Sequence, residues 1–284
     1  MPCYATPLPR WHAIGACSPP PRARRAAAAP GRDLIVWAGW LAALALTLAC
    51  FEFISGRTIW AFVWDAPTQG ADLIERMFPP AWGYAHVLWK PMWDTINMAT
   101  LGTGIAIVIG FPLAFLAAHN TTPSVLFVRP MVLFIIVASR SINSLIWALI
   151  QVIVLGPGLL AGILSIALRS IGFIAKLLYE AIEEIDRSQV EAVTATGASG
   201  PQVLAWSIVP QVMTAFAGIS VFRWDINIRE ATVLGLVGPG GIGMQLQASI
   251  NTLAWPQVAM ISVLILGTVA VSEWLSARVR HAVI

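Results

Sequence analysis

Residues 183–210 of this chain read EEIDRSQVEAVTATGASGPQVLAWSIVP, a polar stretch set between long apolar runs. Apolar residues such as Ile185 and Val190 recur among acids and amides, a pattern that predicts an amphipathic helix. Gly197 interrupts the pattern, and a glycine at such a point ends or bends a helix. We therefore predict a helix–turn–helix over residues 183–207 that lies outside a bilayer and receives force from a partner protein.

The composition requires lipid as the solvent for much of the chain. Of the 284 residues, 58% are hydrophobic and 11% are charged, with a mean hydropathy of +0.77, whereas soluble domains carry about 25% charged residues. Backbone groups in lipid need internal partners, so only helical bundles and closed barrels are available. The apolar runs are continuous rather than alternating, which predicts an all-α membrane protein. The net charge of +3 gives no case for nucleic-acid binding.

Six apolar segments are predicted to cross the bilayer, within a domain that covers residues 34–284. They lie at about residues 34–54, 95–118, 126–155, 159–182, 209–224 and 258–275. Tryptophans, which prefer the membrane interface, concentrate in the external segment 55–93. Arg169 and Lys176 fall within the fourth predicted span, and Glu273, near the end of the sixth, is expected at the headgroups.

Basic residues at both ends predict that both termini face the cytoplasm. Residues 1–33, with five Arg and seven Pro, are predicted to form a disordered tail; a transit peptide or a mis-assigned start codon are the alternatives. The arginines before the first span are Arg22, Arg24, Arg25 and Arg32, and residues 278–281 are basic as well. An even number of spans agrees with this orientation and puts residues 183–207 in the cytoplasm.

Four acids crowd the end of the fourth predicted span: Glu180, Glu183, Glu184 and Asp186. Negative charge is unfavourable at a helix carboxyl end because of the helix dipole. We therefore expect this helix to continue into the cytoplasm, with the acids solvated.

A second informative stretch is FRWDINIREATVLGLVGPGGIG, at residues 222–243. It contains Arg223, Asp225, Arg229 and Glu230 beside the fifth predicted span, where charge is expensive and usually functional. Asp225 and Arg229 are four residues apart, so they can pair along one helix face. Arg223 and Arg229 could attract an anion. A purely structural role, in which they lock helices through Asp225 and Glu230, is favoured because buried charges are so often paired.

The glycines after this charged stretch, Gly238, Gly240, Gly241 and Gly243, are predicted to break the helix and form a re-entrant turn that gates the path. A simple loop is the alternative. The run satisfies the GxGxxG pattern, but dinucleotide binding requires a βαβ unit, which the sequence lacks. Arg140, in the third predicted span, could face the pore, or it could bond backbone carbonyls or reach an interface.

No catalytic residue, cofactor or metal site is predicted. The sequence has no GxxxxGK[ST] loop, so the chain is not expected to hydrolyse ATP itself, and it has no GxSxG elbow. The histidines and cysteines lack metal-ligand spacing. These residues are His12, His86, His119, His281, Cys3, Cys17 and Cys50. A membrane-embedded enzyme is therefore disfavoured.

The spacing Glu191-Ala192-x4-Gly197-x12-Pro210 resembles the cytoplasmic loop of ABC-importer permeases, although Val193 stands where that family favours Ala. The resemblance implies a type I ABC-importer permease fold with about six transmembrane helices and a cytoplasmic coupling helix. In that family the loop docks into a groove of an ATPase subunit. It further implies that Glu191 shapes this contact through charge or a cap-like bond, and Gly197 through its turn.

The charged and glycine-rich stretch closely resembles the permeases of phosphonate and related reduced-phosphorus ABC importers, as do residues 169–186 and 195–199; the resemblance covers roughly residues 90–280. It implies a translocation subunit for phosphonate, phosphite, hypophosphite or a similar anion, in the inner (plasma) membrane of a bacterium. The implied partners are ABC ATPase subunits, a periplasmic or extracellular substrate-binding protein, and a second copy or a sibling permease.

Two other kinds of transporter remain alternatives to this interpretation. The first is an ABC permease for methionine or another small solute, and the charged stretch is the sequence feature against it. The second is a stand-alone ion-coupled carrier, which predicts internal inverted repeats that the sequence does not display.

Overall fold

The computed structural model describes residues 30–283, and every regular element among them is a helix. Arg22, Arg24 and Arg25, with most of the predicted tail, lie outside the described residues. The chain divides into two units after Thr68. The described part of the first unit consists of α1 (Pro30–Ser55), which begins within the predicted tail, and the start of α2 (Trp60–Met77).

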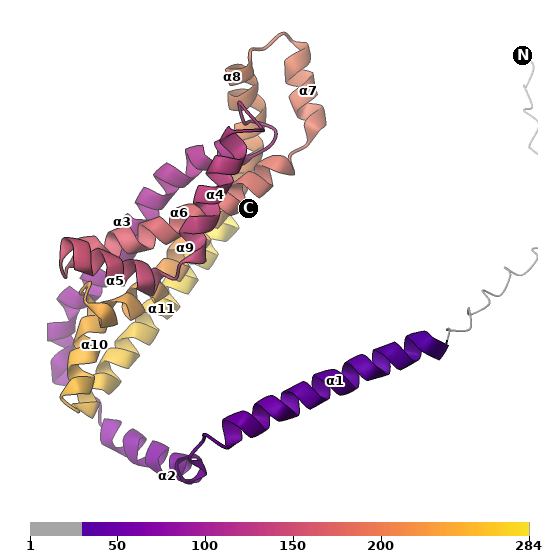
Figure 1. The fold of residues 1–284 in the computed structure, drawn as a ribbon. Helices are drawn as coiled ribbons and strands as arrows, with labels where there is room; N and C mark the ends of the chain where they lie inside the picture. The colour runs from indigo at the N-terminus through magenta and orange to yellow at the C-terminus, as the bar shows by residue number, and fades with distance from the viewer. Residues whose placement is uncertain (1–29, 284) are drawn as a thin grey trace, which may run out of the picture. The chain divides into compact units, whose positions relative to one another are not determined.

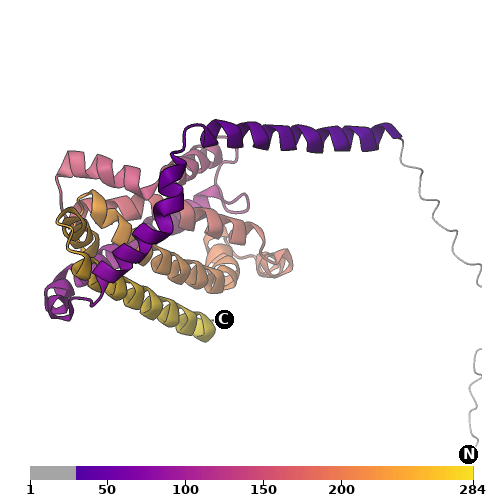
Figure 2. The same ribbon diagram turned by 90° about the horizontal axis from the view of Figure 1, so that it is seen from below.

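The second unit is a bundle of helices. After the rest of α2 come η1 (Trp82–Tyr84), α3 (Ala85–Ala117), α4 (Val128–Ser141), α5 (Ser144–Leu155), α6 (Leu159–Glu183), α7 (Arg187–Ala195), α8 (Gly200–Val203), the π-helical turn η2 (Leu204–Ile208), α9 (Val209–Leu234), η3 (Gly235–Val237), α10 (Ile242–Asn251) and α11 (Trp255–Val283). Figures 1 and 2 place the α7–α8 hairpin and α10 at opposite ends of this bundle. The predicted helix–turn–helix, which contains α7 and α8, therefore projects from one end.

Among the described residues, five helices are long and apolar enough to cross a membrane, and they fall in α1, α3, α6, α9 and α11. The number becomes six if the bent pair α4 and α5 is counted as one span. The third predicted segment, 126–155, is therefore not one straight helix, because the chain turns by 90° between α4 and α5. Asn143 caps the start of α5, because its side chain accepts a hydrogen bond from the N–H of Leu145.

The helix that contains the fifth predicted span runs further than the span, and this extension matters for the site. The sequence placed the end of that span at residue 224, but α9 continues to Leu234. The charged residues Arg223, Asp225, Arg229 and Glu230 therefore lie inside a long helix rather than after it.

Small residues allow α3 and α6 to approach closely. Gly102, Ala106, Gly110 and Ala114 recur every four residues on α3, and all four are buried. A Cβ atom built on Gly102 would lie 2.8 Å from Cγ2 of Ile166 on α6. Such small-residue stripes drive helix association in lipid, where apolar side chains gain little from leaving the solvent.

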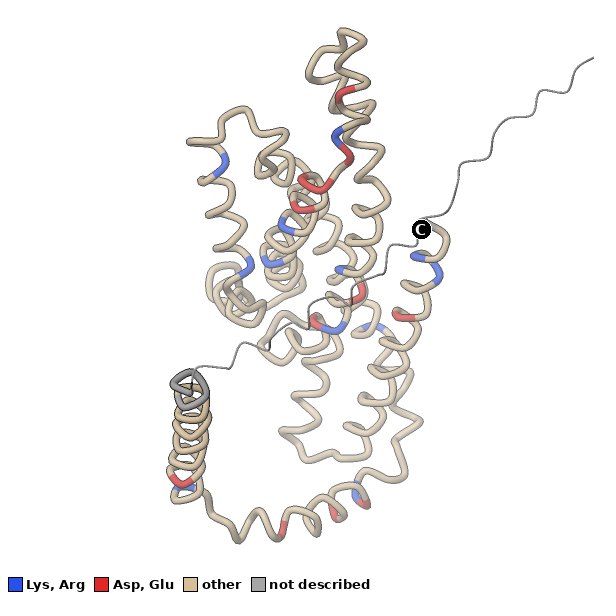
Figure 3. Tube along the Cα trace, turned by 90° about the vertical axis from the view of Figure 1, so that its right-hand side faces the viewer, with Lys and Arg blue, Asp and Glu red and all other residues tan. Residues whose placement is uncertain are grey.

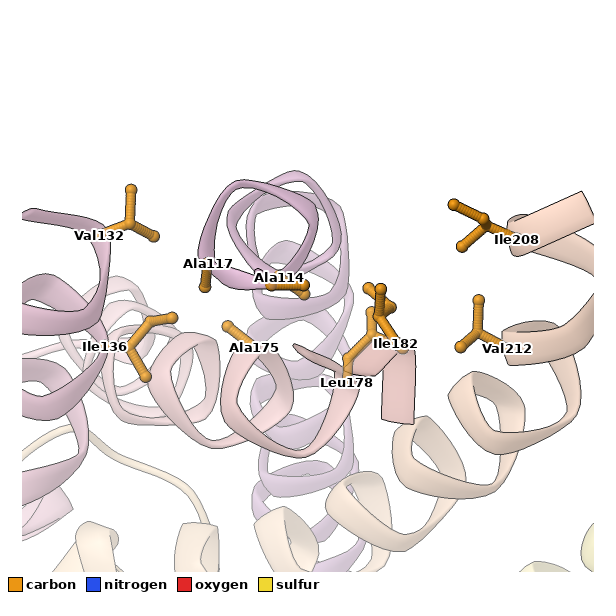
Figure 4. Packing of buried hydrophobic residues seen from close by; sticks show 10 residues of the cluster. Ala114, Ala117, Val132, Ile136, Ala175, Leu178, Ile182, Ile208 and Val212 are labelled. Atoms are coloured by element: carbon orange, nitrogen blue, oxygen red, sulfur yellow. The ribbon is translucent and has the colours of Figure 1, made fainter. Parts of the chain in front are cut away.

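One end of the bundle is closed by an apolar core that joins α3, α4, α6, α9 and the turn η2. Figure 4 shows Ala114 and Ala117 of α3 facing α6, where Leu178 and Ile182 lie. The same cluster includes Val132 and Ile136 of α4, Ile208 of η2 and Val212 of α9. Ile185, Val190 and Leu204 pack against it, so the hairpin is attached to the bundle by apolar contacts.

Candidate functional site

The charges of α9 fall on two opposite faces of that helix. Arg223, Asn227 and Glu230 are spaced by four and three residues, so they share one face, whereas Asp225 and Arg229 lie on the other. Figure 3 shows charged residues gathered midway along the bundle as well as at its α7–α8 end. Two separate groups of charges result, one between α6 and α9 and the other between α9 and α11.

The α6–α9 charge group consists of Arg169, Arg223 and Glu230. The Glu230 carboxylate lies 2.5 Å from Nη1 of Arg169 and 3.4 Å from Nη2 of Arg223. The Arg223 side chain is only 2% exposed; its Nε donates to Ser170 at 3.0 Å, and its guanidinium lies 4.9 Å from the ring centre of Phe173. Two guanidiniums thus share one carboxylate, and Arg223 is enclosed by protein on all sides.

An uncharged network extends this group to α3. The Asn227 amide donates to the hydroxyl of Thr103 at 2.7 Å and to that of Ser170 at 3.0 Å. Both Asn227 and Ser170 are fully buried. Because buried polar groups stabilise a unique arrangement only when they are satisfied, these bonds fix the register of α3, α6 and α9.

The α9–α11 charge group consists of Asp225, Arg229 and Glu273. Arg229 pairs with Asp225 on its own helix and, at 3.2 Å, with Glu273 of α11. The hydroxyl of Ser272 donates to the Asp225 carboxylate at 2.8 Å. The predicted Asp225–Arg229 pair is therefore confirmed. Glu273 is 59% exposed and pairs with Arg229 ten residues before the last residue of α11; its expected place at the headgroups stays a prediction.

Two cavities flank Arg229. One of about 510 Å³ lies between α9 and α11 and is lined by Asp225, Arg229 and Glu273. The other, of about 330 Å³, lies between α5, α6 and α9 and is lined by Ser144, Arg169, Arg229 and Glu230, among others. Both fall in the size range of about 300–1,000 Å³ that is usual for small-ligand sites.

Arg140 does not join either charge group. Arg140 lies in the last turn of α4 and is exposed. Within residues 30–283 it forms no ion pair. Its predicted place on the translocation path stays a prediction.

The glycine-rich turn after α9 breaks the helix as predicted. Gly238, Gly240 and Gly241 have φ values of +108°, +97° and +76°, a region that side chains rarely adopt. The N–H of Ile242, which opens α10, donates to the Thr95 hydroxyl of α3 at 2.8 Å. Gly243 packs so closely that a Cβ atom on it would lie 2.8 Å from Cα of Gly235. The turn is a compact, packed structure.

The predicted coupling segment is a short helical hairpin. Asp186, not Glu191, caps α7, because its carboxylate accepts a hydrogen bond from the N–H of Ser188 at 2.9 Å. Hydrogen bonds from the side chain and the backbone of Ser188 lower the pKa of the Asp186 carboxyl from its ordinary value. The role expected of Glu191 in the ATPase contact, through charge or a cap-like bond, stays a prediction. Gly197 has a φ of +80° and makes the turn after α7, as predicted.

The other residues of this segment are accessible. Glu191 and Ala192 are exposed on α7, and Glu191 lines a groove of about 230 Å³ that is shared with Asn120 and Ile208. Pro210 lies in the first turn of α9, directly after the π-helical turn η2. Because proline has no N–H and crowds the carbonyl four residues earlier, it accounts for the local widening of the helix.

Contrary to expectation, α6 does not continue past all four acids at its end. It ends at Glu183, which accepts hydrogen bonds from Arg129 at 3.0 Å and from the N–H of His119 at 2.9 Å. Glu180 pairs with Lys176 one turn earlier. Glu183 is therefore held by partners outside α6, whereas Glu180 pairs within α6 itself.

Sequence reasoning named all six members of the two charge groups but did not predict which of them pair across helices. Arg169 and Glu273 were noted, but nothing in the sequence linked them to α9. Their signal was the presence of an ionisable residue within an apolar helix, which indicates a buried partner or a polar path. Asn227, Ser170 and Thr103 gave no signal, because hydroxyl and amide residues are common in membrane helices.

Comparison with known proteins identifies the family. The family described as "Binding-protein-dependent transport system inner membrane component" matches residues 110–283. The phosphite transport system permease protein PtxC of Stutzerimonas stutzeri is 39% identical over 74% of this chain and 76% of its own length. The phosphate-import permease protein PhnE of Mycolicibacterium smegmatis is 39% identical over 78% of this chain and 43% of its own length.

Solved structures show the same fold. A chain of the MetNI methionine ABC transporter, in inward-facing conformations, superposes with a TM-score of 0.63 at 21% identity. The match covers 72% of this chain and 99% of that chain. A match at this identity shows the fold alone. It confirms the predicted all-α fold of a type I importer permease.

Proposed function

Because this chain belongs to the family of binding-protein-dependent transport system inner membrane components, we propose that it is the permease subunit of an ABC importer for phosphite, a phosphonate, hypophosphite or a related phosphorus oxyanion. The assignment of the cargo rests on the 39% identity to PtxC over three quarters of both chains. The family assignment argues against a stand-alone ion-coupled carrier. It leaves methionine or another small solute as the competing cargo.

The physics of the cargo supports this proposal. Moving a small ion from water into a medium of low dielectric constant costs on the order of 20 kcal/mol. An oxyanion therefore needs a polar path and a driven change of access. Three arginines, Arg169, Arg223 and Arg229, lie on the helices between which such a path would pass.

The energy would come from a separate ATPase that binds the α7–α8 hairpin. In this proposal Glu191, Ala192 and Gly197 meet the ATPase, and Pro210 marks the stiff connection to α9. The exposed residues of α7, the fixed turn at Gly197 and the apolar packing of the hairpin on the bundle support such a role. Both termini and the hairpin then face the cytoplasm.

The other face of the bundle would receive cargo from a substrate-binding protein. The turn formed by Gly238, Gly240, Gly241 and Gly243, with α10, lies at the end opposite the hairpin and would act as the gate there. Arg140 at the bend between α4 and α5 would contribute to the path. A second copy of the chain, or a sibling permease, would complete the transporter.

Uptake by a host from which this gene is deleted tests the proposal. We expect the deletion to abolish growth on phosphite or on methylphosphonate as the sole phosphorus source, and the gene to restore it. An ATPase and a secreted binding protein should co-purify with the tagged chain. Unchanged uptake of every phosphorus compound, together with a loss of methionine uptake, would overturn the cargo assignment and keep the family.

A further inference from the structure

The cavity between α5, α6 and α9 presents cationic and hydroxyl groups to one small volume. Its polar lining residues are Asn143, Ser144, Arg169, Arg229 and Glu230, and the rest of the wall is aliphatic. Ser144 is only 3% exposed, and its hydroxyl accepts a hydrogen bond from Nη1 of Arg169 at 3.3 Å. A small cavity with apolar walls and a few convergent polar groups is the usual form of a site that orients a polar ligand.

Arg169 has unused capacity that Arg223 lacks. In the part of the chain that the structure describes, both hydrogen bonds of Arg169 are made by Nη1, to Glu230 and to Ser144. Its Nε and Nη2 groups remain available, and its side chain is 29% exposed. Arg223, by contrast, is 2% exposed and does not line this cavity. The arginine fitted to meet a ligand here is therefore Arg169, while Arg223 serves as a structural lock.

The charges around the cavity favour an anion. The α6–α9 charge group has two cations for one carboxylate, whereas the α9–α11 charge group has Arg229 with two carboxylates. The six charges balance overall, but the excess positive charge lies on the side of Arg169. Since a guanidinium presents several donors in one plane, it suits a tetrahedral oxyanion that accepts two bonds at once.

We propose that this cavity binds the transported oxyanion within the bundle, an inference that rests on the proposed function. Arg169 is the main cationic ligand, and Arg229 approaches from α9. The Ser144 hydroxyl, which accepts from Arg169 and donates to Oδ1 of Asn143, orients the Arg169 guanidinium. Glu230 is the group with which an entering anion competes, because its carboxylate already holds Arg169. Displacement of this contact frees Arg169 from α9, so that anion binding loosens one link between α6 and α9.

Equilibrium dialysis of the purified complete transporter in nanodiscs tests this site. The probe is radiolabelled phosphate, with unlabelled phosphite and methylphosphonate as competitors, and the binding protein is left out. We expect Arg169→Gln to weaken binding about tenfold or more, since hydrogen bonds to charged groups are the strong ones. Glu230→Gln should instead strengthen binding severalfold, because it removes the competing carboxylate. Lys176→Gln, which removes a cation from the same helix outside the cavity, is the control and should bind like the wild type.

The opposite signs of these two variants separate a binding site from a structural lock. If Arg169 and Glu230 only hold helices together, both variants weaken binding alike or leave it unchanged, and the inference is overturned. If the Arg169→Gln transporter fails to assemble, two other variants still decide between a binding site and a structural lock. They are Arg169→Lys, which keeps the charge, and Glu230→Gln. Uptake in cells separates a failure of this site from a failure of the proposed function. If the wild type and Arg169→Gln transport equally well, only the site is overturned. If the wild type takes up no phosphorus compound, the proposed function is overturned.

Discussion

The guanidinium of Arg129, in the first turn of α4, lies 3.0 Å from the carboxylate of Glu183, the last residue of α6. The same carboxylate oxygen accepts the N–H of His119, and Nε of Arg129 donates to the carbonyl of Ala117 at the end of α3. One ion pair therefore gathers the ends of three helices where the predicted coupling segment begins. Any displacement of that segment must act on this joint.

The Arg129–Glu183 pair should contribute measurably to stability. Both side chains are about two-thirds buried, and Arg129→Gln with Glu183→Gln in a double-mutant cycle should give a coupling energy of about 0.5–1 kcal/mol. Reversible unfolding in mixed micelles measures it. The exposed pair Asp72–Arg76, whose charged atoms are 3.9 Å apart, is the control and should give a coupling near zero. Equal coupling for the two pairs would contradict the assignment.

Close packing of α3 on α6 makes Gly102 sensitive to a single methyl group. Gly102→Ala should destabilise the protein by about 1–3 kcal/mol, because the new Cβ would lie 2.8 Å from Cγ2 of Ile166. Gly104→Ala is the matched control, since no atom lies within 4 Å of its Cβ position. Thermal unfolding in detergent compares them. Combining Gly102→Ala with Ile166→Ala should lower stability by less than the sum of the two changes.

The turn at Gly197 should be required for coupling rather than for insertion. Gly197→Pro should leave the protein in the membrane but separate ATP hydrolysis from uptake, because the turn needs a φ of +80° and proline is fixed near −65°. Gly200→Ala, in the same hairpin without a positive φ, is the control. Uptake and ATPase activity of the assembled transporter are the measurements. Normal uptake by the Gly197→Pro variant would remove the coupling role.

Asp186 should hold α7 in its capped form over the whole physiological pH range. Because the folded state lowers the pKa of this carboxyl, its contribution is present above the unfolded pKa and is lost only as the pH falls through the lowered value. Hydrogen exchange of the Ser188 amide should therefore show constant protection between about pH 6 and pH 8, once intrinsic rates are corrected. Asp186→Ala should abolish the protection and Asp186→Asn retain much of it. Equal protection in both variants would contradict the cap.

The sequence determined the class of the protein and the position of its two polar stretches. Long apolar runs predict helices in lipid, because apart from a closed barrel only a helix gives every backbone N–H and C=O group a hydrogen-bond partner there. Gly197 and the glycines around Pro239 were recognised as turns, since the backbone conformations needed at such points are open to glycine and to few other residues. The pair Asp225–Arg229 followed as well, because it joins residues one helical turn apart.

Only the tertiary structure decided which charges meet across helices. Glu230 faces Arg169, which precedes it by 61 residues, and Glu273 faces Arg229 across 44 residues. The bend at Asn143 and the end of α6 at Glu183 likewise depend on partners elsewhere, such as Arg169 beside Ser144 and Arg129 beside Glu183. Local spacing fixes what lies on one face of a helix. The rotation of that helix against its neighbours is fixed by packing, here by the small residues of α3 against α6 and the buried bonds of Asn227, and no local pattern contains that information.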